Sequence, residues 1–352
     1  MSDRRRWTDH PLVQLTRVRY REFFREPEAV FWVFIFPVLL AAGLGIAFRN
    51  RAPERTIVAV VAGDTNAARL ADVLRGSPDI QVSLVSDSAA AEALRTGEIS
   101  LVVVPVTGGR VEYRYDDTRP ESRIARLTVD DALQRGAGRR EPVPVRDRLV
   151  HERGSRYIDF LVPGLLGMNL MGSGIWGVGF AIVDARKKRL LKRLIATPMS
   201  RPQYLGSFVL SRLTLLVIEV GLLLGFGALV FGVPFRGSLL MLVTICVVSS
   251  LAFTSLGLLV SSRVQTIEGA SGLMNLVMLP MWIFSGVFFS ASRFPDSLQP
   301  FIQALPLTAV VDALRANILR GAGWETMGPE IAIITAWLGV SFLLALKLFR
   351  WR

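Results

Sequence analysis

The sequence predicts a polytopic α-helical membrane protein with six transmembrane helices and a small extracytoplasmic α/β domain between the first two. Hydrophobic residues make up 51% of the 352-residue chain, and its mean hydropathy is +0.42. Runs of membrane length with few or no charges recur along the chain, which is rare in soluble proteins. One long segment, residues 48–157, is instead polar and carries charges of both signs.

The first span is expected at residues 30–47. Its sequence, VFWVFIFPVLLAAGLGIA, contains no charged residue. A helix of this length extends roughly 27 Å, about the thickness of the hydrocarbon core of a bilayer. The residues before it, 1–29, are too many for the n-region of a signal peptide, and the run is too long for an h-region, so we expect a retained anchor.

Five further spans are expected, followed by a short tail at 349–352. Their expected bounds are 158–183, 206–232, 238–262, 269–290 and 330–348. Glu219 is the one charge in the apolar run 213–232 of the third span. Because an uncompensated carboxylate is costly at this depth, we expect Glu219 to accept an interhelical hydrogen bond, possible donors being Asn169 and Asn275, or to line a cargo path.

The chain between the fifth and sixth spans, residues 291–329, has no run long enough to cross a bilayer. Its sequence is nevertheless apolar over much of its length and is interrupted by Pro295, Pro300 and Pro306. Irregular backbone at membrane depth must be shielded by protein or water. We therefore expect a re-entrant segment of short helices that enters the outer leaflet, with an exposed loop as the alternative.

Residues 48–157 are interpreted as a small α/β domain. Four β-rich runs alternate with helical stretches of about ten residues, the pattern of βαβ units. These runs are TIVAVVA (56–62), IQVSLV (80–85), ISLVVVPV (99–106) and RVEYRY (110–115). Residues 136–156 are expected to be a linker back to the bilayer. The single cysteine, Cys246, lies in the fourth span, so no disulfide supports the domain.

The distribution of Lys and Arg predicts the orientation. The flanks on one side of the spans, which include both termini and residues 184–205, hold 18 of these residues, against four in the opposite loops. Positive charge favours the cytoplasmic side, so we expect both termini in the cytoplasm. A nucleic-acid-binding module would concentrate basic charge in a soluble domain. The α/β domain is close to neutral, so we expect no nucleic-acid partner.

The motifs of enzymes are absent from the sequence. Nothing fits G-x-x-x-x-G-K-[ST], so the chain lacks a phosphate-binding Walker loop. We expect no catalytic, cofactor-binding or metal site. The glycine-rich run 164–179 lies inside an apolar span, where small residues let helices approach closely. Gly221 and Gly225 form a G-x-x-x-G motif in the third expected span, and this motif also fits close packing of helices.

The basic segment, residues 184–205 (DARKKRLLKRLIATPMSRPQYL), carries seven Lys or Arg. Leu190, Leu191, Leu194 and Ile195 recur at helical spacing between the basic residues. An amphipathic helix of this kind could bind anionic headgroups, with about 1 kcal/mol from each basic residue. It could equally dock into a groove on a partner protein.

The order of these parts resembles the type-2 ATP-binding cassette (ABC) exporter permeases. The second span and the basic segment match that family in Pro163-Gly164, in a span rich in small residues, in Leu191 and Leu194, and in Thr197-Pro198. Residues 284–321, which include LPLT and DALR, resemble a later signature of the family, and RVRYREFFREPEAVFW resembles its N-terminal connecting helix. The chain departs from the family pattern before the leucines, where Ala185, Arg189 and Leu190 stand in place of a glutamate and Gly-Thr.

The resemblance implies a permease subunit in the bacterial inner membrane that moves a drug, lipid or polysaccharide outward. The implied partners are a separate ABC ATPase, which uses ATP and magnesium, a second permease copy or a homologous permease, and membrane lipid. The basic segment would be the coupling helix that docks on the ATPase. The residues expected to couple are Arg186, Lys187, Leu190, Leu191, Leu194, Ile195, Thr197 and Pro198. The residues expected to line the cargo path are Asn169, Glu219 and Asn275.

Two other classes of function remain open. The protein could be a membrane-anchored sensor that uses its α/β domain, or an ion-coupled transporter in which Glu219 carries protons.

Overall fold

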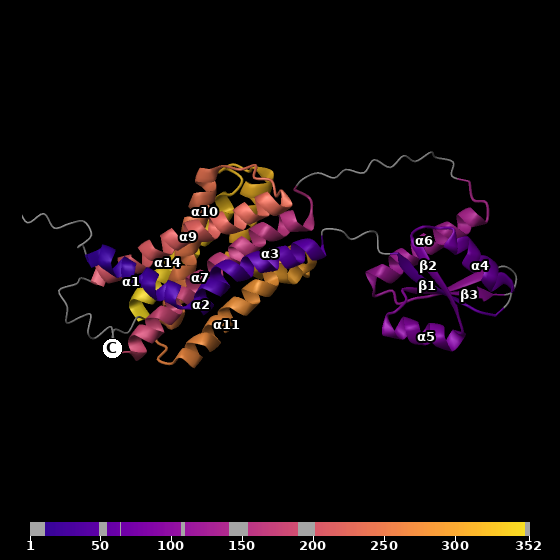
Figure 1. The fold of residues 1–352 in the computed structure, drawn as a ribbon, viewed down its shortest axis with the longest axis horizontal. Helices are drawn as coiled ribbons and strands as arrows, with labels where there is room; N and C mark the ends of the chain where they lie inside the picture. The colour runs from indigo at the N-terminus through magenta and orange to yellow at the C-terminus, as the bar shows by residue number, and fades with distance from the viewer. Residues whose placement is uncertain are drawn as a thin grey trace, which may run out of the picture. The chain divides into compact units, whose positions relative to one another are not determined.

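The computed structural model describes residues 11–48, 55–63, 65–106, 110–140, 154–188 and 201–348. The chain divides into two compact units. One comprises residues 1–49 and 151–352, and the other comprises residues 50–150. The first unit is helical throughout its described part and the second is an α/β domain (Figure 1), as the sequence predicted.

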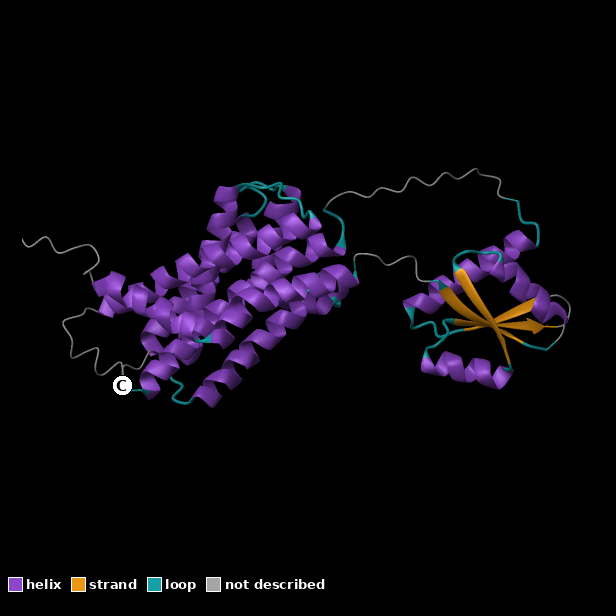
Figure 2. Cartoon of the chain, viewed as in Figure 1, coloured by secondary structure: helices purple, strands orange, loops and turns teal. Residues whose placement is uncertain are grey.

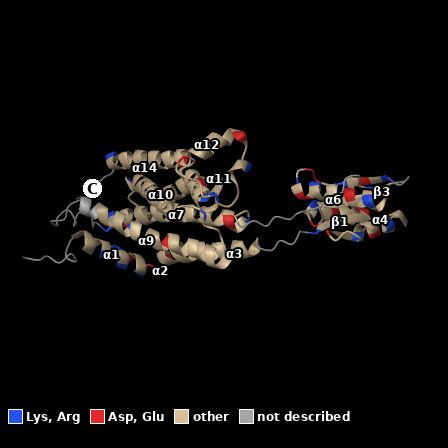
Figure 3. Cartoon of the chain, turned by 90° about the horizontal axis from the view of Figure 1, so that it is seen from above, with Lys and Arg blue, Asp and Glu red and all other residues tan. Residues whose placement is uncertain are grey.

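Six helices of the first unit are long and apolar enough to cross a bilayer. In the part of the chain that the structure describes, they are Pro27–Ala47 (α2, η2 and α3), Tyr157–Lys187 (α7), Val209–Phe231 within α9 (Arg201–Phe231), Leu239–Ser261 (α10), Ile267–Phe284 (α11) and Gly328–Leu348 (α14). Long stretches of these helices carry neither basic nor acidic side chains (Figure 3). The chain is therefore a multi-pass membrane protein, and the predicted fold class is confirmed.

The first span is preceded by a separate helix and contains an irregular turn. Helix α1 (Pro11–Arg25) ends before Pro27, which opens α2 (Pro27–Val30). The π-helical turn η2 (Phe31–Ile35) then leads into α3 (Phe36–Ala47). Proline is tolerated at the start of α2 because the first N–H groups of a helix have no partner. Pro37 lies instead inside the continuous run of η2 and α3, so it removes one helical hydrogen bond.

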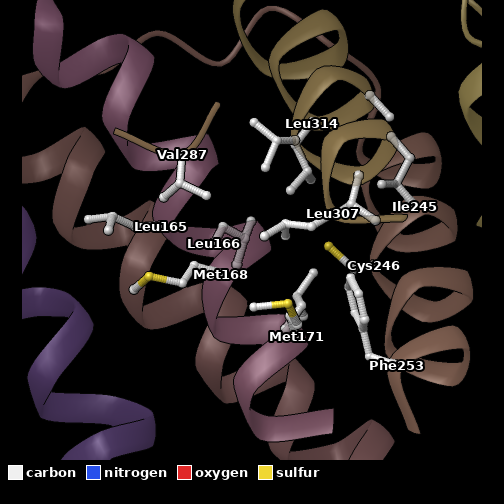
Figure 4. Packing of buried hydrophobic residues seen from close by; sticks show 14 of the residues in the cluster. Leu165, Leu166, Met168, Met171, Ile245, Cys246, Phe253, Val287, Leu307 and Leu314 are labelled. Carbon is white, nitrogen blue, oxygen red and sulfur yellow. The ribbon is translucent and has the colours of Figure 1, made fainter. Parts of the chain in front are cut away.

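Helix α7 is the centre of the first unit. Two thirds of its most apolar window is buried inside the chain, compared with 22% for the first span and 17% for α14. Leu166 and Met171 of α7 lie toward side chains of α10 and of the later re-entrant segment, whereas Leu165 and Met168 point to the opposite side of α7 (Figure 4), and all four belong to one buried cluster. An apolar helix buried on nearly all sides, as α7 is, acts as the core of a bundle.

The fifth span is shorter than expected. Helix α11 ends at Phe284 rather than at residue 290. Gly286 adopts a left-handed conformation with φ of +74°, which glycine reaches without steric cost. Arg315 Nη2 donates to the Gly286 carbonyl at 2.6 Å, so a side chain from a later part of the chain stabilises the backbone at the end of α11.

Residues 291–329 contain several short helices rather than a simple loop. They are η3 (Ala291–Arg293), η4 (Asp296–Leu298), α12 (Gln299–Ala304), α13 (Pro306–Arg315) and η5 (Ala316–Arg320). The stretches Asp296–Ala304 and Pro306–Arg320 meet at an angle of 86°. Eight of the ten residues of α13 are buried, which contradicts the exposed-loop alternative for this helix.

The second unit contains a four-stranded sheet in the order β2-β1-β3-β4 (Figure 2). Strands β1 (Thr56–Val61), β2 (Ile80–Val85) and β3 (Leu101–Val106) are parallel, whereas β4 (Arg110–Arg114) pairs antiparallel with β3. Helices α4 (Thr65–Arg75) and α6 (Pro120–Gly136) bury residues against one apolar cluster, and α5 (Asp87–Thr96) packs on a second. The four predicted strands are present to within two residues.

Helix α6 was not predicted. Its sequence, PESRIARLTVDDALQRG, is rich in charge, and Ile124 and Leu127 on it are more than 60% exposed. Only Ser122, Ala125 and Val129 are buried, at a helical spacing of three and four. The buried stripe of α6 is narrow and two of its three side chains are small, so it gave a weak hydrophobic signal in the sequence.

Candidate functional site

Glu219 lies deep in the first unit and forms an ion pair with Arg212. Both residues belong to α9, seven positions apart, and their side chains are 0% and 8% exposed. Arg212 Nη1 donates to Glu219 Oε1 at 2.5 Å and Nη2 donates to Oε2 at 3.1 Å. The bidentate geometry suits a guanidinium and a carboxylate, so the charge of Glu219 is compensated within its own helix.

Two hydroxyl groups connect this pair to neighbouring helices. Ser173 of α7 accepts from Arg212 Nη2 at 2.5 Å and lies 3.2 Å from Glu219 Oε2. Ser250 of α10 accepts from Arg212 Nε at 3.2 Å. The pair and the two serines thus join α7, α9 and α10 by charge-assisted hydrogen bonds, which are stronger than those between neutral groups.

The expected partners of Glu219 were wrong. Neither Asn169 nor Asn275 donates to it. The carboxylate is paired with Arg212 of its own helix, and the donor of its interhelical hydrogen bond is Ser173 of α7. A spacing of seven residues on one helix is two turns, so it places both side chains on one face. The long arginine side chain can therefore reach back to the carboxylate, and this spacing is the signal that could have identified the pair.

Asn169 has a structural role beside Pro37. Its Nδ2 donates at 3.1 Å to the carbonyl of Val33 in η2. That carbonyl lies four residues before Pro37, whose missing N–H cannot supply the usual helical hydrogen bond. Asn169 is 7% exposed, so its amide satisfies a backbone group inside the bundle and does not face an open surface.

Asn275 differs from the other two residues of the expected cargo path, because it is exposed on the outer side of α11. Exposed hydroxyls in the described spans, such as Thr214 and Thr335, donate to the carbonyl four residues earlier. The side-chain amide of Asn275 does not donate to a backbone carbonyl of its own helix in this way, and Asn275 forms no hydrogen bond within the described chain. A group of this kind is costly against lipid, which favours a polar environment on this face of α11.

Arg186, in the last turn of α7, binds the chain's own backbone. Nη1 donates to the carbonyls of Ser261 at 3.0 Å and Val264 at 2.5 Å, and Nη2 donates to that of Ser262 at 3.1 Å. These carbonyls belong to the end of α10 and the turn into α11. Arg186 was expected to contact an ATPase, and the structure instead directs its guanidinium into the first unit.

The two lysines after Arg186 are exposed. Lys188 donates to Asp184 Oδ2 at 2.8 Å. This hydrogen bond raises the pKa of Lys188, and the nearby charges of Glu26 and Glu22 add to the effect. Lys187 and Lys188 thus lie on the surface where α7 leads into the basic segment, with Lys188 paired to Asp184. The remaining residues expected to couple, Leu190, Leu191, Leu194, Ile195, Thr197 and Pro198, lie outside the described residues.

Arg315 and Asn317 hold the re-entrant segment in place. Arg315 Nη2 donates to the carbonyls of Gly286 and Phe160, and its guanidinium stacks 3.5 Å from the centre of the Phe160 ring. Asn317 accepts from the Ser238 N–H at 3.1 Å and donates to its carbonyl at 3.3 Å. These two side chains tie α13 and η5 to α7, to the end of α11 and to the turn before α10.

The polar groups of the described chain form ties between helices and do not assemble a reactive centre. No group of three or more His, Cys, Asp or Glu residues is placed to hold a metal ion in the residues that the structure covers. The arrangement can hold helices in register, and it presents a basic surface at one end of α7.

Comparison with known proteins gives one consistent result. A family model described as "ABC-2 family transporter protein" matches residues 28–347. The chain is 29% identical to Nodulation protein J of Bradyrhizobium diazoefficiens over 206 residues, which are 56% of this chain and 76% of that protein.

Two permeases of Escherichia coli are also similar. The inner membrane transport permease YhhJ is 27% identical over 173 residues, 49% of this chain and 46% of its own length. The probable multidrug ABC transporter permease YbhR is 24% identical over 184 residues, 51% of this chain and 50% of its own. The matched segment therefore spans about half the length of each of these relatives.

Proposed function

This chain belongs to the ABC-2 family of transporter proteins, and we propose on that premise that it is the permease subunit of an exporter driven by a separate ATPase. The observation that carries the proposal is the combination of six apolar helices with a sequence that has no Walker loop. Residues 1–352 contain no nucleotide-binding loop, so ATP hydrolysis would take place outside them, and we assign it to a separate subunit in this proposal.

The basic segment is the proposed docking site for that ATPase. It follows directly from α7, the most buried of the described spans. A force applied to the basic segment would therefore reach the core of the bundle through a continuous helix. The aliphatic residues Leu190, Leu191, Leu194 and Ile195 would enter a groove on the ATPase, and Lys187, Thr197 and Pro198 would flank the contact. A lipid surface is the alternative ligand.

The proposed location is the inner membrane of a bacterium, with both termini and the basic segment in the cytoplasm. The excess of basic residues on that side supports this orientation. The α/β unit, residues 50–150, and the re-entrant segment would then lie on the outer side.

The proposed cargo is hydrophobic or amphipathic, and a drug, a lipid or a polysaccharide is compatible with the sequence. Of the three residues expected to line its path, Asn275 retains that role in the proposal because its amide faces away from the chain's own core. A second permease copy on this face would complete the path. Glu219 and Asn169 are engaged in bonds within the bundle.

The two other classes of function gain no support from the site. Glu219 would have to exchange protons with a transport pathway to drive an ion-coupled transporter, but both of its carboxylate oxygens are engaged by Arg212 inside the bundle. No described residue of the α/β unit forms a candidate metal site, and no further observation favours a sensor.

The proposal is tested by transport in inside-out membrane vesicles that contain the permease and a co-expressed ABC ATPase. A fluorescent short-chain phospholipid and an amphipathic cationic dye serve as probes. We expect ATP-dependent uptake of at least one probe, abolished when the catalytic glutamate of the ATPase is replaced. Uptake that instead requires a proton gradient and survives loss of the ATPase would support the ion-coupled alternative.

A further inference from the structure

Helices α7 and α10 approach each other more closely than side chains normally allow. A Cβ atom on Gly257 of α10 would lie 2.8 Å from the carbonyl oxygen of Ile175, and one on Gly174 of α7 would lie 2.7 Å from Cβ of Phe253. Backbone contact of this kind between glycines leaves no flexible side chain that could absorb relative motion. The two helices therefore form one stiff pair at this level.

Arg186 connects the same two helices at their end. The carbonyls of Ser261 and Ser262 belong to the last turn and C-cap of α10 and lack intrahelical partners. The C-terminus of a helix also carries partial negative charge, which a guanidinium complements. Arg186 supplies donors to both carbonyls and to that of Val264. A side chain of α7 thus serves as the C-terminal cap of α10.

We propose that Arg186 is a positioning residue that makes the end of α7 and the turn from α10 to α11 move as one body. A displacement of the basic segment is then delivered to α10 and α11 as well as to α7. This inference rests on the proposed function, because it assigns a path to the force that the ATPase applies. The planar fork of arginine suits several carbonyls at once, whereas the single ammonium of lysine does not.

The tie itself is tested on the purified permease alone, without ATPase or cargo. We expect Arg186→Gln to accelerate amide hydrogen exchange in residues 261–266, with Arg186→Lys intermediate. The matched control is Arg263→Gln, which removes an exposed arginine of the same turn. Wild-type exchange in Arg186→Gln would overturn the inference, whatever the protein transports.

The role in coupling is tested on the complex. Arg186→Gln should still copurify with the ATPase but lose roughly tenfold in probe transported per ATP hydrolysed, which corresponds to about 1.4 kcal/mol. A short bismaleimide between Arg186→Cys and Val264→Cys, in a Cys246→Ser background, should restore transport because it replaces the tie.

The other outcomes separate the two claims. Loss of ATPase copurification in Arg186→Gln would show that Arg186 contacts the ATPase, and would overturn the inference. Hydrogen exchange could be accelerated in Arg186→Gln while the wild-type complex shows no ATP-driven transport. That result would refute the proposed function and the coupling role of Arg186, and would leave the tie between α7 and α10 in place. Failure of the crosslink to restore transport would leave Arg186 as a helix cap only.

Discussion

Glu219 and Arg212 place two opposite charges on one face of α9, in a region shielded from solvent. The cost of moving such charges out of water is repaid only when the geometry is good and the remaining lone pairs and protons have partners. Ser173 and Ser250 provide those partners. Because the pair lies within one helix, α9 carries no net charge here, and its polar contacts with α7 and α10 at this level are made through hydroxyl groups.

Replacing one member of the pair should be more harmful than replacing both. Glu219→Leu should lower the free energy of unfolding by about 3–5 kcal/mol, since it leaves Arg212 buried without its counter-charge. Adding Arg212→Met should recover much of that loss. Thermal unfolding in detergent of the wild type, both single variants and the double variant measures this. Additive losses in the double variant would contradict the description of the two residues as a coupled pair.

At the scale of the elements, glycines determine where helices touch. The sequence predicted that the glycines of 164–179 permit close approach of helices, and Gly174 confirms it, since a Cβ there would lie 2.7 Å from Cβ of Phe253 in α10. The G-x-x-x-G of α9 behaves differently. A Cβ on Gly221 or Gly225 would meet no atom of the described chain within 4 Å, so the expected close packing is not formed there within this chain.

Two glycine variants distinguish packed from open positions on the α7 and α10 pair. Gly257→Ala should destabilise the protein by about 1–3 kcal/mol, because the new methyl group would be forced against backbone. Gly177→Ala is the matched control on α7, where no atom lies within 4 Å of the added Cβ, and it should be neutral or slightly stabilising. Unfolding midpoints of the two variants make the comparison. Equal midpoints would contradict the close approach.

The elements that the sequence predicted well are those with a strong hydrophobic signal. The six spans and the four strands follow from long apolar runs and from β-branched residues. Helix α6 left only a weak signal because its buried stripe is narrow. The early end of α11 is marked locally only by Gly286, and the arginine that binds its carbonyl, Arg315, lies 29 residues away. In the candidate site, the roles of Arg186 and Asn169 depend on carbonyls more than 70 residues away in the chain, so they could not be read from the sequence.

At the scale of the whole molecule, the distribution of charge predicts how the protein crosses the membrane. Lys187→Cys in a Cys246→Ser background should resist an impermeant maleimide added to intact cells and react after the cells are opened. Asp117→Cys in the α/β unit is the matched positive control, because residue 117 is exposed and expected outside. Labelling of position 187 in intact cells would reject the proposed orientation.

The central claim is that a separate ATPase drives this permease through the apolar face of the basic segment. The most direct measurement is copurification of the ATPase, with its cargo-stimulated hydrolysis, for the double variant Leu191→Asp, Leu194→Asp. We expect both to be lost while membrane insertion, checked by the labelling above, is retained, because an unpaired carboxylate at a buried contact costs several kcal/mol. Charge reversal at Lys187 and Lys188 should have a smaller effect, since exposed ion pairs contribute little. Normal copurification and normal stimulated hydrolysis in the double leucine variant would contradict the account and leave a lipid surface as the ligand of the basic segment.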